Sequence, residues 1–255
     1  MIQMGREEAT SFTTSRGTRR PSTKIVHAPI SAHGSRTISS LSAHRLKGRV
    51  LLWKSGRRYM ISVGLVMLQG ARHDHISSLN EASRDLGLEI EIIEIRKLSE
   101  LKSTDPDAIV IPGGESTTMR KTGQDKSSML IPGMFDWIRD NPSKPVLGTC
   151  AGAILLADPQ DGNPPLVEAQ IDRNAYGPQY ESFQATVRSS LLGREFPGIF
   201  IRAPKFISSE NEVCATMGKE IVGVKNGRVI ALTFHPELSS DKGFHRWLLE
   251  SVCGE

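Results

Sequence analysis

The chain has 255 residues, 38% of them hydrophobic, which allows one core domain of about 190–200 residues with an appendage. No run of roughly 18–20 apolar residues occurs, so helical membrane spans are excluded and we expect a soluble protein. Residues 1–60 contain 12 Lys and Arg and two Glu, a balance of +10, and the formal net charge of the whole chain is +4. Residues 61–255 therefore have a balance of −6, so the high pI is not a sign of a basic nucleic-acid-binding surface on the domain.

Residues 1–59 are predicted to lie outside the folded domain, which we expect over residues 60–255. They are rich in Ser, Thr, Arg and Gly and lack the hydrophobic density that offsets chain entropy, which predicts a disordered basic extension. The same composition, poor in acids, also fits an organellar transit peptide. A third interpretation is a mis-assigned start with Met60 as the true first residue, because an apolar strand begins directly after it.

From residue 61 onward, short apolar runs alternate with helical stretches, which is typical of a parallel α/β sheet with helices on its faces. The strand expected over residues 89–95 alternates acids with isoleucine in part, which predicts an edge position. The other elements of this half are expected as strands over 61–67, 107–111 and 145–148 and as helices over 72–86, 129–140 and 153–157.

After residue 165 the pattern changes to shorter strands, expected over 166–171, 182–188 and 198–202. Asn226-Gly227, with valines on both sides, predicts a hairpin with a type I′ turn. A strand over 228–234 then leads to His235, and a helix near 241–252 ends the chain. The whole pattern predicts a single-domain α/β fold with a mostly parallel sheet flanked by helices.

Cys150 is the candidate nucleophile among three cysteines. The odd number, without CxxC spacing or paired histidines nearby, supports neither a disulfide framework nor a zinc site and predicts a reducing, cytoplasmic environment. Cys150 lies in Gly148-Thr149-Cys150-Ala151-Gly152, between an apolar strand and an apolar helix, as in a nucleophile elbow. The helix N-terminus there favours a thiolate. The alternative is an inert buried cysteine. Cys214 lacks an elbow, and Cys253 is close to the chain end.

His235 and Glu237 are the candidate base and acid. His235 follows an apolar strand, at the end where open α/β sheets place their sites. It can take a proton from the sulfur and return it to a leaving amine, while Glu237 orients the imidazole and stabilises its cation. The alternative is a surface histidine in a turn.

A third motif, Pro112-Gly113-Gly114, follows a buried strand. Consecutive glycines expose backbone N–H groups, and those of Gly114 and Ala151 are candidates for an oxyanion hole. A plain loop is the alternative, whereas a phosphate-binding loop is disfavoured because no GK[ST] sequence follows.

Together these motifs resemble those of class I, triad-type glutamine amidotransferases, and within that group those of the glutaminase subunits of pyridoxal 5′-phosphate synthase. The resemblance runs from about residue 60 to the end. GxCxG and HPE are shared with many amidotransferases, but the Gly-Gly-Glu-Ser-Thr-Thr and Ile-Arg-Ala-Pro stretches are specific. The segments that carry it are Leu68-Gln69-Gly70-Ala71, 112–120, 148–152, 173–177, 200–204 and 234–238.

The resemblance implies a flavodoxin-like fold and a Cys150–His235–Glu237 triad. It also implies that Gln69 lies near the synthase interface and that glutamine is bound by Gly113, Gly114, Glu115, Arg173, Ile201 and Arg202. Arg173 is a suitable cation for the α-carboxylate of glutamine. The chain departs from the family pattern at Asp74, where Glu is common, and at Pro178, where Arg is usual, so no contact at 178 is carried over.

The implied reaction is hydrolysis of L-glutamine to L-glutamate and ammonia, without metal or cofactor. The implied partner is the synthase subunit that builds pyridoxal 5′-phosphate, the active form of vitamin B6, in a large hetero-oligomer. No nucleic-acid or membrane partner is expected. The alternatives are an amidotransferase subunit of another pathway, a cysteine peptidase of similar topology and a non-catalytic interaction module.

Overall fold

The computed structural model describes residues 41–46, 49–54, 57–70, 72–173, 175 and 182–254. Strands β1(Leu41–Leu46), β2(Arg49–Lys54) and β3(Arg57–Tyr59) form an antiparallel sheet of their own. The disordered extension expected over residues 1–59 falls largely outside the described residues. Where the backbone is described it is paired in strands, which agrees with the apolar and aromatic residues of Val50-Leu51-Leu52-Trp53. The Pro178 departure also lies outside the described residues.

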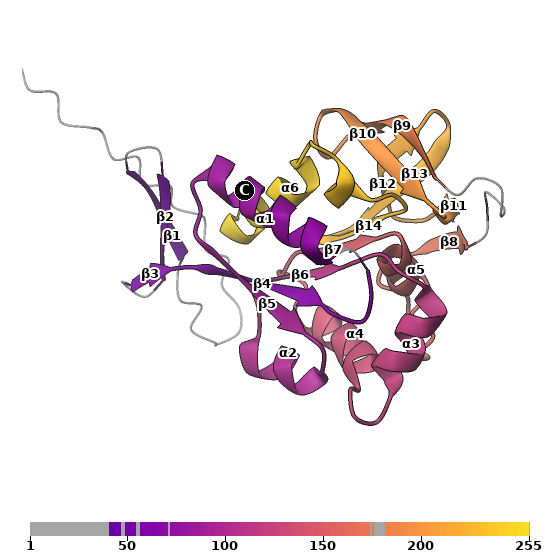
Figure 1. Ribbon diagram of the computed structural model, residues 1–255, viewed down its shortest axis with the longest axis horizontal. Helices are drawn as coiled ribbons and strands as arrows, with labels where there is room; N and C mark the ends of the chain where they lie inside the picture. Colours follow the sequence, from indigo (N-terminus) through magenta and orange to yellow (C-terminus); the bar gives the residue numbers. More distant parts are fainter. Residues whose placement is uncertain are drawn as a thin grey trace, which may run out of the picture.

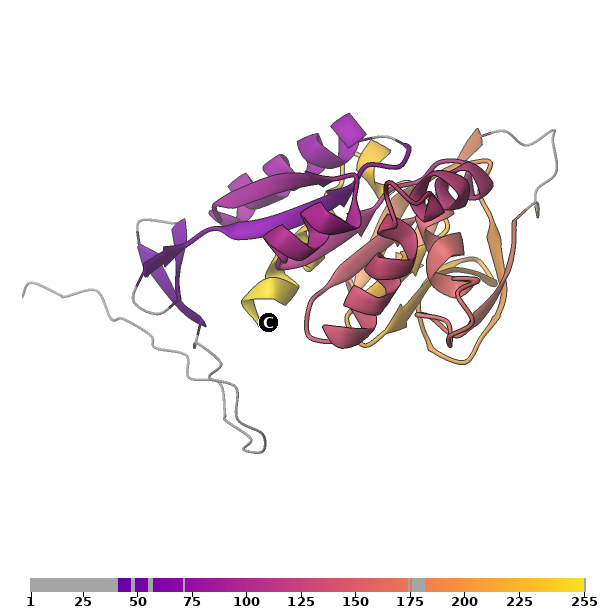
Figure 2. The same ribbon diagram turned by 90° about the horizontal axis from the view of Figure 1, so that it is seen from below.

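The main sheet has 11 strands in the order β10-β9-β12-β13-β14-β7-β6-β4-β5, with β11 pairing with β13 and β8 (Figure 1). The parallel half is formed by β4(Ile61–Val66), β5(Ile90–Ile95), β6(Ala108–Ile111), β7(Val146–Thr149) and β14(Val229–Leu232). The antiparallel strands are β8(Ala169–Asp172), β9(Ser182–Ser189), β10(Arg194–Ile201), β11(Lys205–Ser209), β12(Glu212–Met217) and β13(Glu220–Asn226). The sheet is therefore mixed, and Figures 1 and 2 show the antiparallel strands gathered at one end.

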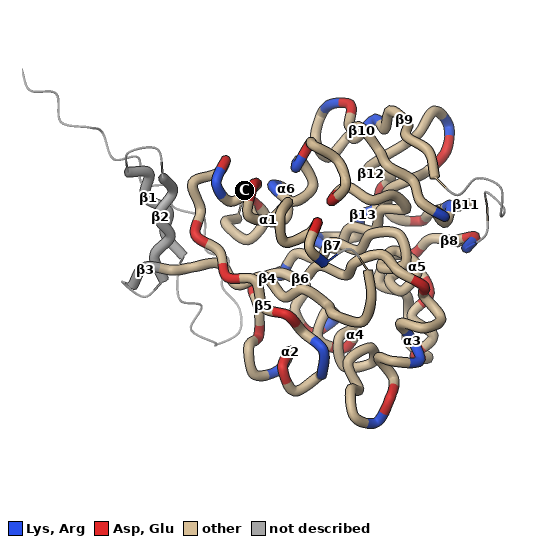
Figure 3. Tube along the Cα trace, viewed as in Figure 1, with Lys and Arg blue, Asp and Glu red and all other residues tan. Residues whose placement is uncertain are grey.

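The sequence explains this division. Strands β6, β7 and β14 are short apolar runs, buried almost throughout, and together with β4 they carry no charged residue (Figure 3). Such runs need cover on both faces of the sheet, as parallel strands do. Strand β9 instead alternates buried or half-buried positions with exposed ones, as a strand with one wet face does.

Helices cover both faces of the parallel half (Figure 1). One face carries α1(Arg72–Leu86) and α6(Gly243–Cys253); the other carries α2(Leu98–Thr104), α3(Ser116–Gln124), α4(Leu130–Asp140) and α5(Ala151–Ala157). Successive residues of β6 point to opposite faces, so Val110 joins the core under α1 and α6 while Ile109 joins the core under α4 and α5. None of the helices described here combines the length and apolar content that a bilayer span requires.

The predicted α/β fold class is confirmed, and β5 is the edge strand that its acidic alternation predicted. Elements α2, α3, β11 and β12 were not predicted, and neither were strands β1, β2 and β3. The hairpin is present, but its turn type was predicted wrongly. Asn226 ends β13 and pairs with Val229, so the turn residues are Gly227 and Arg228. Of these two residues only Gly227 has a positive φ (56°). A type I′ turn requires a positive φ at both turn residues, whereas a type II′ turn requires it only at the first, so the turn fits type II′.

Candidate active site

The three predicted motifs meet at the carboxyl edge of the parallel strands. Strands β6, β7 and β14 are neighbours in the sheet. Gly113 lies two residues beyond β6, Cys150 directly follows β7, and His235 lies three residues beyond β14. Because parallel strands end at one edge, residues more than 80 positions apart in the sequence come together there.

Cys150 lies on a sharp strand-to-helix turn, as an elbow requires. Its backbone has φ 50° and ψ −107°, a conformation that side chains rarely adopt. The Cys150 N–H donates to the carbonyl of Leu232 at 2.8 Å, which ties the turn to β14. A Cβ atom on Gly152 would lie 2.2 Å from the Ile111 carbonyl oxygen, and one on Gly148 would lie 3.0 Å from the backbone of Gly152. The two glycines therefore let neighbouring backbone pass close to the turn.

We expect Gly152→Ala to destabilise the fold and to impair the elbow. The new methyl group meets backbone rather than a flexible side chain, so the turn or β6 must shift, at a cost of about 1–3 kcal/mol. Urea denaturation measures this cost. The control is Lys121→Ala on the exposed face of α3, which should change the unfolding free energy by less than about 0.5 kcal/mol. A Gly152→Ala chain as stable as the control contradicts the tight elbow.

His235 and Cys150 face the same glycine. A Cβ atom built on Gly113 would lie 2.6 Å from His235 Cε1 and 3.1 Å from Cys150 Cβ, so all three crowd one point. The His235 N–H donates to the Ile199 carbonyl at 2.8 Å, which fixes the backbone of the histidine against β10. Cys150 is 6% exposed and His235 is 8% exposed, so both residues are largely shielded from solvent.

Glu237 completes a line of three groups. Its Oε1 lies 2.7 Å from His235 Nδ1, which leaves the other ring nitrogen for the cysteine. Burial alone would lower the pKa of His235, but the hydrogen bonds to Cys150 and Glu237 and their negative charges raise it above its ordinary value. Burial also opposes the charge of Glu237, but His75 and His235 lower the pKa of Glu237 to about 2. The arrangement can hold a thiolate beside an imidazolium, with an ionised carboxylate behind them.

The low pKa of Glu237 predicts a loss of stability in acid. A carboxyl group with a pKa of about 2 when folded and 4.5 in its unperturbed state stabilises the fold fully above pH 4.5. That contribution declines as the pH falls from 4.5 toward 2. We expect the difference in unfolding free energy between wild type and Glu237→Gln to shrink over this window, measured by urea denaturation at stepped pH. If this difference in unfolding free energy stays constant from pH 6 to pH 3, the pKa of Glu237 is not lowered by folding.

The loop after β6 is ordered by Glu115 and Gln69. Glu115 caps α3 by accepting from the backbone N–H of Thr117 at 2.9 Å and of Thr118 at 2.7 Å. The hydrogen bond from the Thr118 side chain, followed by the two backbone bonds, lowers the pKa of Glu115 to about 2. Gln69 Oε1 accepts from the Glu115 N–H at 2.7 Å. Gln69, predicted to lie near a partner, therefore also holds the loop that contains Gly113 and Gly114.

The remaining predicted binding residues fall into two groups. Ile201 lies beside Cys150, because its carbonyl oxygen is 3.9 Å from Cys150 Sγ. Arg202 follows with a positive φ of 44°. Arg173 is paired with a carboxylate of its own chain, since its Nη2 lies 3.0 Å from Asp158 Oδ2. Asp158 also has the guanidinium of Arg120 3.6 Å away, so this carboxylate is shared by two arginines.

Comparison with known proteins decides the family. Residues 65–254 match the SNO glutamine amidotransferase family. The chain belongs to this family. A relative from Thermococcus onnurineus, named pyridoxal 5′-phosphate synthase subunit PdxT, is 38% identical over 204 residues, covering 76% of this chain and 100% of the relative. A relative of the same name from Ignicoccus hospitalis is 41% identical over 209 residues, covering 75% and 100%. The predicted resemblance is thus confirmed.

A solved structure agrees with the sequence comparison. A crystal structure of a glutamine amidotransferase is 36% identical and superposes with a TM-score of 0.61, covering 75% of this chain and 98% of that one. The amidotransferase fold therefore extends over the part of the chain that contains the three motifs. Within the described residues of this family member, no group of three or more His, Cys, Asp or Glu side chains is arranged to hold a metal ion.

Some residues at the site were not predicted as functional. His75 is fully buried, and its Nε2 lies 3.5 Å from Glu237 Oε1. The signal for it was present, because His75 lies on the same helix face as Leu79 and Ala82 and is an uncommon residue for a core. Asp158 was also not predicted, since its pairing with Arg173 depends on a contact between loops.

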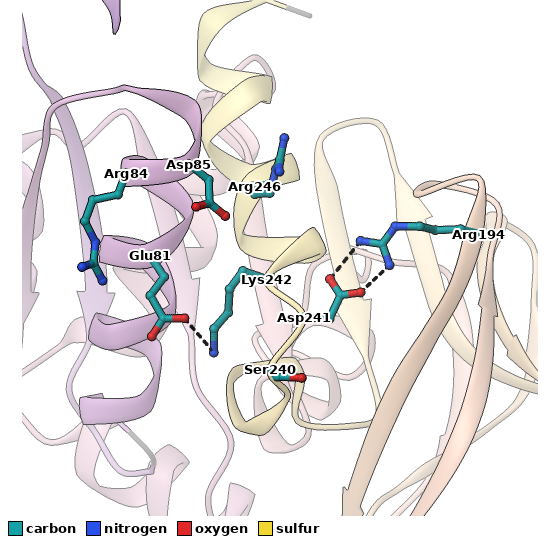
Figure 4. A pocket seen from close by; sticks show the side chains of 8 residues that line it. All are labelled: Glu81, Arg84, Asp85, Arg194, Ser240, Asp241, Lys242 and Arg246. Carbon is teal, nitrogen blue, oxygen red and sulfur yellow. Dashed lines mark hydrogen bonds and ion pairs between the residues drawn. The ribbon is translucent and has the colours of Figure 1, made fainter. Parts of the chain in front are cut away.

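A separate polar pocket of about 370 Å³ lies away from the motifs (Figure 4). Its charges largely pair with one another. Arg194 binds Asp241 through both guanidinium nitrogens, and Lys242 Nζ lies 3.7 Å from Glu81 Oε2. The pocket lies where α1, the beginning of α6 and the first residue of β10 meet. Its lining residues are Glu81, Arg84, Asp85, Arg194, Ser240, Asp241, Lys242 and Arg246.

Proposed function

We propose that this chain hydrolyses L-glutamine to L-glutamate and ammonia and passes the ammonia to a synthase subunit that makes pyridoxal 5′-phosphate. The proposal is supported by the family and by the name of its relatives. The observation that carries the chemistry is the convergence of Cys150, His235 and Glu237 at one edge of the sheet. We assign the amidotransferase domain to residues 60–255 and leave residues 1–59 outside it.

In the proposed reaction, Cys150 thiolate attacks the side-chain carbonyl carbon of glutamine. The new S–C bond forms a tetrahedral intermediate, whose oxyanion is stabilised by the backbone N–H groups of Gly114 and Ala151. Protonated His235 gives its proton to the leaving nitrogen, the C–N bond breaks, and a thioester and ammonia result. Water then attacks the thioester while His235 takes its proton. The C–S bond breaks, and glutamate leaves with Cys150 restored as thiolate.

Glutamine binding is proposed at Gly113, Gly114, Glu115, Arg173, Ile201 and Arg202. The α-carboxylate of glutamine is a suitable ligand for the Arg173 guanidinium. Because Arg173 is paired with Asp158 in the structure, the substrate carboxylate must replace or join the Asp158 carboxylate when it binds. No metal or cofactor enters the proposed half-reaction.

A partner follows from the chemistry of the product. At neutral pH free ammonia is mostly ammonium, a poor nucleophile, so a subunit that receives it before protonation uses it more efficiently. We propose that this partner is the synthase subunit, in a cytoplasmic hetero-oligomer. Gln69, which holds the loop beside the nucleophile, lies on the proposed contact surface.

The test is glutamate release from L-glutamine by the full chain, with and without the synthase subunit. We expect release that the synthase stimulates and that Cys150→Ala abolishes. Peptide hydrolysis by Cys150 identifies a peptidase instead. Binding of the synthase without turnover identifies an interaction module, and stimulation only by an acceptor subunit of another pathway reassigns the partner while keeping the glutaminase.

A further inference from the structure

The carboxylate of Glu237 has a second imidazole behind it. Its Oε1 lies 2.7 Å from His235 Nδ1 and 3.5 Å from His75 Nε2. On the far side of that ring, His75 Nδ1 lies 3.0 Å from His245 Nε2. Both outer histidines are 0% exposed. A line of polar groups therefore runs from Cys150 through the core to α6, and only its first part enters the proposed mechanism.

The protonation of the two outer histidines can be assigned. Burial lowers the pKa of His75, opposed by Glu237 and Asp74 and assisted by His235. Burial lowers the pKa of His245 to about 3, assisted by the neighbouring His75 and Lys242 and opposed by Glu237. Both rings are therefore neutral at pH 7, and each has one N–H group.

An ionised carboxylate only accepts hydrogen bonds, so the N–H of His75 belongs on Nε2, facing Glu237. His75 Nδ1 then accepts from the Nε2–H of His245. The opposite tautomers turn a lone pair of His75 toward the carboxylate, where only the Thr149 hydroxyl at 3.4 Å can donate to it. They also leave an N–H on His245 Nδ1, which has no hydrogen-bond partner among the described residues. A buried donor without a partner is rarer than a buried acceptor without one, which favours the first assignment.

Helix α1 holds Glu237 at two points. One turn after His75, the Ser78 hydroxyl donates to the Glu237 backbone carbonyl at 3.1 Å. Lys242 Nζ donates to Ser78 Oγ at 3.1 Å and also reaches Glu81 on α1 (Figure 4). Thr149 Oγ1, next to the nucleophile, lies 3.4 Å from His75 Nε2. The side chain and the backbone of Glu237 are thus both fixed from the same helix.

We propose that His75, with its tautomer set by His245, is a positioning residue for the triad: its Nε2–H is the second donor to Glu237 and keeps the carboxylate ionised and directed at His235. The kinetic consequence rests on the proposed glutaminase function. The consequence for the Cys150 thiol does not, because transfer of the thiol proton to His235 depends on Glu237 whatever the substrate is.

The first test needs no activity. The full chain, labelled with nitrogen-15 at histidine, is studied by long-range proton–nitrogen correlation at pH 7, and the rings are assigned with single His→Gln variants. We expect a proton on Nε2 of both His75 and His245 and none on Nδ1. A proton on His75 Nδ1 overturns the proposal.

The second test follows the Cys150 thiolate. The rate of alkylation by iodoacetamide is measured against pH on the Cys150 peptide by mass spectrometry. In His75→Leu we expect the rate at pH 7 to fall about tenfold, because a carboxylate without its second donor stabilises the His235 imidazolium less, and with it the Cys150 thiolate. His75→Gln keeps a donor near the Nε2 position and should stay within about twofold. The matched control, His73→Leu, changes an exposed histidine of the same helix and should leave the profile unchanged.

Two results would overturn the positioning role: a wild-type profile in His75→Leu, or equal losses in His75→Gln and His75→Leu, which would point to ring packing alone. If His75→Leu does not fold, His75→Gln and the nitrogen spectra decide. Glutamate release with the synthase adds a kinetic reading, in which kcat falls about tenfold in His75→Leu at unchanged KM. A wild type that alkylates as expected but releases no glutamate rejects the proposed function and leaves this inference standing.

Discussion

Cys150→Ala should lower glutamate release by a factor of about 10⁶, to the level of the blank, when measured with the synthase subunit at saturating glutamine. The methyl group offers no nucleophile, and the other two cysteines cannot substitute for the missing thiol. Cys214 is fully buried in β12, where burial raises the pKa of its thiol to about 12, so it remains protonated and inaccessible. Cys253 lies in the last turn of α6.

The control for this loss is Cys214→Ala, which removes a thiol without touching the elbow. It should retain activity once its folded fraction is accounted for by circular dichroism. Glutamine binding should survive in Cys150→Ala, because the proposed binding groups are on other loops, and calorimetry can measure it. Residual release well above the blank, with the variant folded, would show that Cys150 is not the nucleophile.

Glu237→Gln should lower kcat by about 10⁴ and change KM little, as loss of the orienting carboxylate does in related triads. The Oε1–Nδ1 distance of 2.7 Å fixes which ring nitrogen of His235 carries the proton in the neutral state. The side-chain amide of the Gln at position 237 can donate a hydrogen bond to His235 Nδ1. It then holds His235 in the tautomer whose proton is on the other ring nitrogen. It also provides no charge to stabilise the imidazolium that forms when the thiol ionises.

Steady-state rates against glutamine concentration, measured with the synthase bound, give kcat and KM separately. The control is Glu212→Gln, which breaks only a surface pair with Lys225. We expect it to be silent, because exposed ion pairs contribute little. A Glu237→Gln enzyme within tenfold of wild type would mean that His235 is oriented by its backbone bond to Ile199 alone.

The parts of the site that sequence reasoning predicted share one property: each motif directly follows an apolar strand. The runs before Pro112, before Cys150 and before His235 mark strands of a parallel sheet, and parallel strands end at one edge. Once the strands are recognised, the convergence of the motifs follows without coordinates. The edge position of β5 is predicted for a similar reason, since its acidic alternation is incompatible with burial on both faces.

The parts that were missed depend on contacts between elements distant in sequence. His75 and His245 are 170 positions apart, and nothing local indicates that α1 and α6 place their rings 3.0 Å apart. The pairing of Arg173 with Asp158 joins two loops, whose course local propensity does not determine. Helix α3 was missed because Ser116-Thr117-Thr118 are weak helix formers, and the capping of this helix by Glu115 compensates for them.

Strand β5 also determines how the sheet can grow. An edge strand presents unpaired backbone groups that a second copy could use to continue the ladder. Glu91 and Glu94 lie on this edge, and Glu94 is near Arg72 and Arg96 of its own chain. If two β5 strands paired, their carboxylates would lie close together and the local ion pairs of Glu94 would be disrupted. Both effects disfavour edge-to-edge association of two sheets. The two acidic side chains of this edge strand therefore act against ladder formation between copies of the chain.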